Sequence, residues 1–291
     1  MELPLVVGVD GSESSLQAVD WAVDEAARLG LPLRLVHASL WERYEGVDLV
    51  YDLGRPSEQQ MAETIVRTAA ERARLRNPDV KVSAYVLAED PEGALLREAR
   101  NASALVTGQR GRGQVADLLL GSVSLTTAAQ AHCPVVVVRG SQDSRNGTHG
   151  RIVLGVGDAA TGAAAIGFAF REAQTRGCAL DAVRAWRCPA HETADRPLLA
   201  GEPAHYHQQQ ATELLGDALR TVVREYPDVE VHRTIVEGPA RKVLLDRAGD
   251  ADLLVIGARR RHGQFGLQLG RVGHAVLHHA DCPVAIVPQH G

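Results

Sequence analysis

Three glycines lie within six residues in the stretch GQRGRGQVADLLLGSVS, which spans residues 108–124 and follows the short apolar run ALVT. Glycine permits backbone torsions, and a close approach to a ligand, that a side chain would prevent. Successive backbone N–H groups in such a loop can surround an anion. The stretch therefore indicates either a flexible connection or a loop that holds phosphate groups.

Gly121 and Ser122 stand near the end of this stretch, where a second apolar segment begins. Ser122 is suited to cap a helix there, and the amino end of a helix offers N–H donors with a partial positive charge. Ser122 and Ser124 could add hydroxyl donors to phosphate oxygens. If the glycines are considered by themselves, an ordinary loop followed by a helix cap is the simpler interpretation. The place of the stretch in the fold therefore decides between an ordinary loop and a phosphate-binding loop.

Asp10 follows the opening apolar run, in the sequence GVDGS. One interpretation is a turn or helix-capping residue, which is a common use of Asp-Gly-Ser. The other is a carboxylate that accepts hydrogen bonds from the hydroxyl or amino groups of a ligand. Since a carboxylate repels phosphate, a ligand-binding Asp10 would contact the base or ribose end of a nucleotide.

Composition and charge limit the class of protein. The chain has 291 residues, 45% of them hydrophobic, which suits about two domains with ordinary cores. The net charge of -5 gives no general attraction to nucleic acid or anionic lipid. The first residues lack the basic segment of a signal peptide, and no apolar run reaches the length of about 18 residues that a membrane span needs. The four cysteines lack metal-ligand spacing, so we expect a reduced, cytoplasmic protein. From the net charge and the short apolar runs we expect no nucleic-acid or membrane partner.

The chain is an internal duplication. The segment LLLGSVSLTTAAQAHCPVVVV at 118–138 matches LQLGRVGHAVLHHADCPVAIV at 267–287, and three further pairs of segments match at similar offsets. Two copies of one domain, 1–140 and 151–291, therefore account for the chain. The polar stretch SQDSRNGTHG at 141–150 is predicted to be the linker between them.

Within each copy, short β-branched runs alternate with helical patterns. In the first copy a long helix is predicted over about 57–76, and Gly30 is placed to end the first helix. Near-continuous apolar strands are typical of a parallel sheet with helices on both faces. The predicted fold class is α/β, with two tandem doubly wound domains of flavodoxin-like or Rossmann-like type. Each has a five-stranded, mainly parallel sheet. Ligands of such sheets bind beyond the carboxyl ends of the strands where the strand order reverses, so the loops after strands one and four should face each other.

The pattern Gly108-x2-Gly111-x9-Gly121-Ser122 resembles the nucleotide motif G-2x-G-9x-G(S/T) of the universal stress protein family. The opening VVGVDGSESSLQAVDWA, the run LVHA and the closing HCPVVVV resemble the same family. Several motifs in the same order make the resemblance more specific than the glycines alone, and it covers both copies. It implies a tandem universal stress protein of the ATP-binding type.

The resemblance implies that the first copy binds ATP, with or without Mg²⁺. Asp10 and the backbone of Val36 would contact the adenosine part. The phosphates would lie against the glycine loop and the start of the next helix, where Arg110 and Arg112 could add charge. The implied binding residues are Gly8, Asp10, Val36, Thr107, Gly108, Gly111, Arg112, Gly113, Gly121, Ser122, Val123 and Ser124.

The second copy departs from this pattern. Its loop GARRRHGQFGLQLGRVG has arginines where the first copy has Gly111 and Ser122, and Gly157 takes the place of Asp10. Guanidinium groups suit phosphate geometry, but these changes favour a weak site or a different ligand. The corresponding residues are Gly155, Val183, Gly257, Arg260, Gly270 and Arg271.

No catalytic motif accompanies the glycine loop. The chain has no Gly-Lys pair of a P-loop and no GxSxG, HExxH or HRD sequence. His274 and His278 are four residues apart but lack an acidic partner, so we interpret them as solvated or capping residues. Three functions stay open: a nucleotide-dependent regulatory or signalling protein of the stress response, a slow ATPase or phosphotransferase, and a nucleotide-free interaction protein. The resemblance also implies that PVVVV and PVAIV are pairing edges, that the two copies pack as a pseudo-symmetric unit, and that the chain forms a homodimer.

Overall fold

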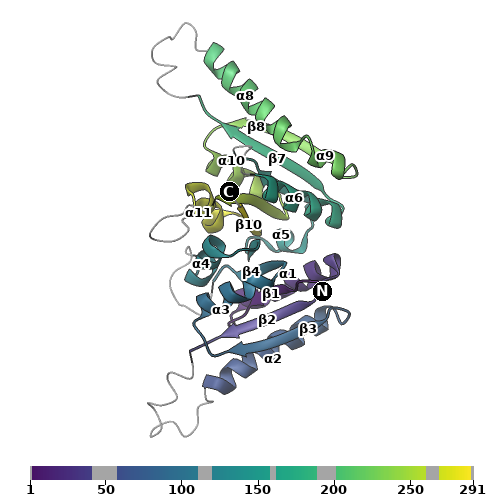
Figure 1. Ribbon diagram of the computed structural model, residues 1–291, viewed down its shortest axis with the longest axis vertical. Coiled ribbons are helices and arrows are strands. Elements are labelled where there is room, and N and C mark those ends of the chain that lie inside the picture. The colour runs from purple at the N-terminus through teal and green to yellow at the C-terminus, as the bar shows by residue number, and fades with distance from the viewer. Residues whose placement is uncertain are drawn as a thin grey trace. The chain divides into compact units, whose positions relative to one another are not determined.

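The computed structural model describes residues 2–40, 58–110, 120–157, 162–188, 201–259 and 269–289. The chain divides into two compact units, Met1–Arg139 and Gly140–Gly291, and in each of them strands and helices alternate (Figure 1). Within the described ranges, no helix has both the length and the apolar content to span a membrane.

The elements of the first unit are β1 (Leu5–Gly8), α1 (Glu13–Leu29), β2 (Leu33–Ala38), α2 (Glu58–Arg76), β3 (Val82–Leu87), α3 (Pro91–Glu98), the 3₁₀ turn η2 (Ala99–Asn101), β4 (Ala104–Gly108), α4 (Ser122–Gln130) and β5 (Val135–Val138). Those of the second are α5 (Gln142–Asn146), β6 (Arg151–Gly155), α6 (Ala163–Arg176), β7 (Ala179–Trp186), α8 (Gly201–Leu219), α9 (Val222–Glu225), β8 (Val231–Glu237), α10 (Ala240–Ala248), β9 (Leu253–Arg259), α11 (Arg271–His279) and β10 (Val284–Gln289).

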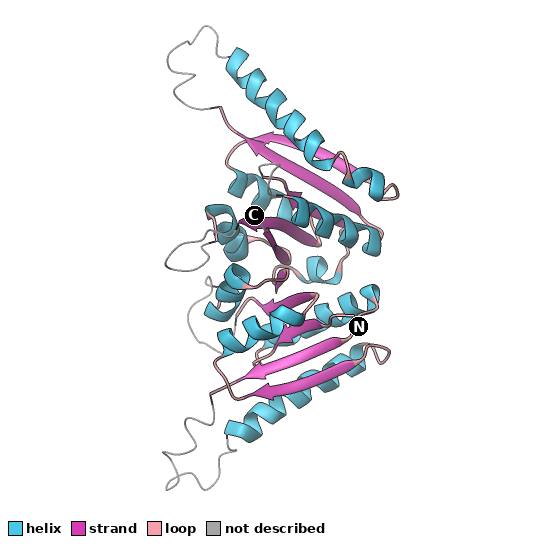
Figure 2. Cartoon of the chain, in the orientation of Figure 1, coloured by secondary structure: helices cyan, strands magenta, loops and turns pink. Residues whose placement is uncertain are grey.

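The strands of each unit form a parallel sheet. In the first unit the described strands lie in the order β3-β2-β1-β4-β5, and each neighbouring pair is parallel. The second unit has the same arrangement, β8-β7-β6-β9-β10. The carboxyl ends of the strands therefore gather at one edge of each sheet (Figure 2). The predicted α/β fold with parallel sheets is confirmed in both units, and the strand order reverses between β1 and β4 and between β6 and β9.

Helices cover both faces of the first sheet. A Cβ atom at Gly108 would lie 2.6 Å from the carbonyl oxygen of Ser14 in α1, and one at Gly8 would lie 2.8 Å from the Leu95 side chain in α3. The register of β1 and β4 points these two glycines to opposite faces. Burial on both faces explains the unbroken apolar runs, such as Val135–Val138, in which every residue is buried.

The predicted ends of two helices are confirmed. Helix α1 ends at Leu29 and is capped by Gly30, whose φ of 68° lies in the left-handed region that glycine adopts without strain. Helix α2 ends at Arg76, as predicted. The irregular stretch expected before α2 falls in residues 41–57, outside the described residues.

The polar stretch 141–150, which was predicted as a linker, packs on the second unit. It contains the short helix α5, and the Ser141 N–H donates to the Asp281 carbonyl oxygen at 3.1 Å. The Asp252 carboxylate, 2% exposed as a residue, accepts hydrogen bonds from the backbone N–H groups of His149 at 2.9 Å and Arg151 at 3.1 Å. These contacts hold both ends of the stretch on the body of the second unit.

A charged pair occupies the same place in both units with reversed polarity. In the first unit Arg34 Nε of β2 lies 2.9 Å from Glu98 Oε2 at the end of α3. In the second, Asp181 Oδ2 of β7 lies 2.6 Å from Arg247 Nη1 of α10. The Asp181 side chain is 4% exposed and also accepts a hydrogen bond from the Thr234 hydroxyl at 2.6 Å. The buried carboxylate thus has both an opposite charge and a hydrogen-bond donor beside it.

Burial of the Cys133 side chain, before β5, raises the pKa of its thiol to about 11. Because the unfolded thiol ionises at about 8.5, its contribution to stability is fully present below that pH and is lost as the pH rises through about 11. We expect a loss of about 2 kcal/mol between pH 8 and pH 10.5 that Cys133→Val does not share. Urea unfolding of both proteins at the two pH values measures this difference; equal losses would contradict it.

Candidate functional site

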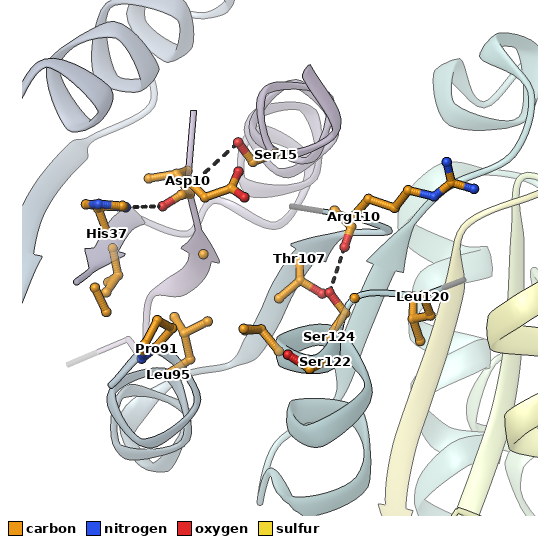
Figure 3. Close-up of a pocket in the computed structure, with 17 residues that line it drawn as sticks. Asp10, Ser15, His37, Pro91, Leu95, Thr107, Arg110, Leu120, Ser122 and Ser124 are labelled. Carbon is orange, nitrogen blue, oxygen red and sulfur yellow. Dashed lines mark hydrogen bonds between the residues drawn. The ribbon is translucent and has the colours of Figure 1, made fainter. Parts of the chain in front are cut away.

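The first unit contains a cavity of about 410 Å³ at the carboxyl ends of β1, β2 and β4, where the strand order reverses. Helices α3 and α4 complete its wall (Figure 3). All nine predicted binding residues that the structure describes in this unit line the cavity: Gly8, Asp10, Val36, Thr107, Gly108, Gly121, Ser122, Val123 and Ser124. The other three, Gly111, Arg112 and Gly113, lie outside the described residues.

Asp10 stabilises the turn that joins β1 to α1. Its Oδ1 accepts hydrogen bonds from the backbone N–H of Ser12 at 3.0 Å and from the Ser12 hydroxyl at 2.6 Å. Ser12 caps α1, since its hydroxyl accepts a hydrogen bond from the Ser15 N–H. The turn interpretation of Asp10 is therefore confirmed. The same carboxylate lines the cavity, where it can accept hydrogen bonds from a ligand.

The loops after β1 and β4 face each other, as the fold class predicted. The Ser12 hydroxyl lies 3.3 Å from the Arg110 carbonyl oxygen, and the Arg110 N–H donates to Ser14 Oγ at 3.3 Å. Gly108 permits this approach because a side chain there would strike the backbone of Ser14. Arg110 thus contributes its backbone to the junction, while its side chain extends away from Asp10 in Figure 3.

The backbone of β2 offers the cavity a residue that the sequence analysis missed. The carbonyl oxygen of Val36, which the resemblance placed beside adenine, already accepts a hydrogen bond from the Val9 N–H at 2.9 Å. Alternate residues of β2 bond to β3 instead, as the bond from the Ser39 N–H to the Leu87 carbonyl at 3.0 Å shows. Ala38 therefore turns its backbone N–H and C=O toward the space beyond the end of β1, where it lines the cavity.

Helix α3 supplies an apolar wall that the sequence analysis also missed. Pro91 and Leu95 line the cavity, and the absence of a side chain at Gly8 lets Leu95 reach the end of β1. On β2, His37 Nδ1 lies 2.7 Å from the Val9 carbonyl oxygen. A glycine at the end of a strand was the only sequence signal for this wall, because the contact depends on where α3 crosses the sheet.

Thr107 lines the cavity at the end of β4, and its hydroxyl is buried. The residue is 4% exposed, and no described residue supplies a hydrogen-bond partner for its Oγ1. Burying a hydroxyl without a partner costs about 1–3 kcal/mol. A hydroxyl of this kind in a cavity wall therefore indicates a polar ligand atom nearby.

Helix α4 begins on the other side of the cavity, and the predicted Ser122 cap is wrong. Gly121 is the N-cap, in an extended conformation, and its N–H donates to the Gln109 carbonyl at 3.0 Å, which holds it outside the helix. Leu125 is the residue that bonds back to the Gly121 carbonyl, at 3.0 Å. The N–H groups of residues 122–124 precede that bond, so they are placed to bind an anion.

The two serines at the start of α4 have different environments. The Ser124 hydroxyl is buried and donates to the Gly108 carbonyl oxygen at 2.7 Å, which ties α4 to the end of β4. Ser122 is exposed. Of the two predicted hydroxyl donors, only that of Ser122 is therefore available to a phosphate without breaking a described bond.

The second unit repeats the backbone of the site but not its polar side chains. The Val156 N–H donates to the Val183 carbonyl at 2.9 Å, as the equivalent residues do in the first unit. Arg184 stands where the first unit has His37, and its guanidinium donates to the carbonyl oxygens of Val156 and Gly157. Ile256 replaces the buried threonine. In the second unit an arginine therefore bonds the strand-end carbonyl that His37 contacts in the first unit, and also the carbonyl of the next residue.

The predicted residues of the second unit fall at equivalent places in its fold. Gly155 ends β6, Val183 lies in β7 and Gly257 in β9, while Gly270 caps α11 and Arg271 is its first residue. Arg260 lies outside the described residues. The residue that caps the helix is glycine in both units, Gly121 and Gly270. The change from Ser122 to Arg271 therefore does not remove a capping hydroxyl from the second unit. The rings of His274 and His278 stack with centroids 5.4 Å apart.

Comparisons with known proteins agree with this fold. The model of the universal stress protein family matches residues 3–139 and 148–288. A universal stress protein of Mycobacterium tuberculosis strain H37Rv is 32% identical over 98% of this chain and 97% of its own. One of Mycolicibacterium smegmatis is 29% identical over 98% and 97%. The crystal structure of a universal stress protein from Archaeoglobus fulgidus covers 98% of both chains with a TM-score of 0.69 at 17% identity.

Proposed function

The chain belongs to the universal stress protein family, and we propose that its first unit binds ATP as a regulatory ligand in a stress response. The nucleotide lies across the carboxyl ends of β2, β1 and β4. The proposal includes a cytoplasmic location and a homodimer, both of which were expected from the sequence.

The adenosine part fits the side of the cavity formed by β1, β2 and α3. The backbone of Ala38 presents a donor and an acceptor to the edge of a base, while Pro91 and Leu95 offer apolar contact to its ring. The Asp10 carboxylate accepts hydrogen bonds from ribose hydroxyls. A ligand with a polar-edged ring and a sugar matches this set of groups.

The phosphates fit the side of the cavity formed by α4. The observation that carries the proposal is that the cavity has a carboxylate in one part and helix N–H groups in another. The carboxylate of Asp10 lines one part of the cavity, and the N–H groups of residues 122–124 line another. Since the first repels phosphate and the second attracts it, the cavity orients a nucleotide. Arg110 and Leu120, the described residues that flank the glycine loop, both line the cavity.

Calorimetric titration of the full chain with ATP tests the proposal. We expect one site per chain, because the second unit has Gly157 in place of the Asp10 carboxylate and Ile256 in place of Thr107. Asp10→Asn keeps an oxygen that can hold the Ser12 turn but removes the charge, so the affinity for ATP should fall about tenfold. Asp79→Asn, in the turn before β3 at the other edge of the sheet, is the matched control and should bind like the wild type.

The outcomes separate the three functions that the sequence left open. Absence of ATP binding would favour a nucleotide-free interaction protein, and two sites per chain would overturn the interpretation of the second unit. Release of inorganic phosphate, followed at saturating ATP, distinguishes a bound signal from a slow ATPase. We expect no release above that of Asp10→Asn.

A further inference from the structure

The hydroxyl of Thr107 is not required by the fold. Its strand neighbours Leu105 and Val106 are fully buried and apolar, and the second unit has Ile256 at the equivalent place in β9. In the second unit Ile256 packs against the strand end, since a Cβ at Gly155 would lie 3.0 Å from its methyl group. The fold therefore accepts an apolar side chain here, and the Thr107 hydroxyl, for which no described residue is a hydrogen-bond partner, calls for a ligand.

Thr107 lies between the two ends of the site. Val7 pairs with Val106, so Thr107 is beside Gly8, on the face of the sheet that α3 covers. Asp10 follows Gly8 by two residues, and the residue after Thr107 is tied to Ser124 of α4. Figure 3 shows Thr107 between Asp10 and Ser124.

This position identifies the part of the ligand that the hydroxyl would contact. A nucleotide with its base near Ala38 and its terminal phosphates at α4 passes its sugar over the end of β1. The next group along the ligand, over the end of β4, is the first phosphate. Phosphate oxygens are charged acceptors, and a hydroxyl hydrogen bond to a charged oxygen is stronger than one between neutral groups.

We propose that Thr107 Oγ1 donates a hydrogen bond to the α-phosphate of the bound nucleotide and so makes the site selective for nucleotides over nucleosides. This inference rests on the proposed function. It also gives the second unit a specific defect, because Ile256 offers no donor at the same place.

Calorimetry with adenosine, AMP and ATP on the full chain tests the assignment. Thr107→Val should weaken AMP and ATP about tenfold and leave adenosine within about twofold, since only the first two carry an α-phosphate. Thr107→Ser keeps the hydroxyl and should retain most of the phosphate preference. The Tm of Thr107→Val without ligand should not fall, because the variant removes a buried hydroxyl that has no described partner.

Thr127→Val provides a matched control. Thr127 is fully buried in α4, outside the cavity lining, and its hydroxyl donates to the Val123 carbonyl at 2.7 Å. This variant should lower the Tm and change the three affinities by the same factor. The two variants thus separate a ligand contact from a structural hydroxyl.

Four results would overturn the assignment. An equal loss of adenosine affinity in Thr107→Val would place the contact on the nucleoside. A lower Tm with unchanged affinities would assign the hydroxyl to the fold. Wild-type protein that binds neither AMP nor ATP would refute the proposed function, and the assignment would fall with it. Wild-type binding with unchanged affinities in Thr107→Val would refute the assignment alone.

Discussion

Replacing Gly108 with alanine should weaken ATP binding about 100-fold and destabilise the first unit by about 2–3 kcal/mol. The new Cβ would lie 2.6 Å from the Ser14 carbonyl oxygen and 2.7 Å from its carbonyl carbon, and these are backbone atoms of α1 that no side-chain rotation can move away. The start of α1 would therefore shift, and with it the turn that holds Asp10. Calorimetry measures the affinity, and urea unfolding measures the stability.

Two other glycines serve as controls for the Gly108 variant. At Gly257, the equivalent position in the second unit, the first atom a Cβ would meet is Gln289 Nε2 at 2.8 Å, the movable end of a side chain. Gly257→Ala should therefore cost only about 1 kcal/mol. Gly93 in α3 has its nearest contact at 3.6 Å, so Gly93→Ala should stabilise the helix by up to about 1 kcal/mol. If Gly108→Ala bound ATP like the wild type, the close approach of β4 to α1 would not be what organises the site.

The sequence predicted the fold and the loops that meet because both follow from local patterns. Alternating apolar runs and helices require a parallel sheet, and a parallel sheet brings the loops after its first and fourth strands together. The repeat then applies the same result to the second unit. Gly30 could be predicted as a helix end because its positive φ is a local requirement.

Ala38 and Leu95 could not be predicted because their roles depend on contacts between distant segments. Ala38 faces the cavity because the last bond between β2 and the β1 side is made by Val36, two residues earlier, whose carbonyl accepts from the Val9 N–H. Leu95 lines the cavity since α3 crosses the sheet at Gly8. The wrong cap at Ser122 has a similar cause, because a bond from the Gly121 N–H to the carbonyl of Gln109, the residue after β4, holds the glycine out of the helix.

The ion pair with reversed polarity could not be predicted from the sequence either, and it leads to a second prediction, on the stability of the second unit. Aligning the two copies sets Glu98 against Arg247, but only the packing of α3 and α10 on their sheets reveals the partners, Arg34 and Asp181. We expect Arg247→Glu to destabilise the second unit by about 3 kcal/mol, because it sets a second carboxylate beside the buried one of Asp181. The Arg247 side chain is 34% exposed, so the new glutamate can turn partly to water, which keeps the loss below that of a fully buried pair.

Adding Asp181→Arg to Arg247→Glu gives the second unit the polarity of the first, and it should restore stability to within about 1 kcal/mol of the wild type. The first unit shows that the fold accepts this polarity, with arginine on the strand and glutamate on the helix. Urea unfolding of the wild type, both single variants and the double variant measures the coupling between the two charges. If the double variant were as unstable as Arg247→Glu alone, the Thr234 hydroxyl and the local packing would matter more than the opposite charges. Recovery would show that each copy needs a neutralised pair between helix and strand, whichever side carries the positive charge.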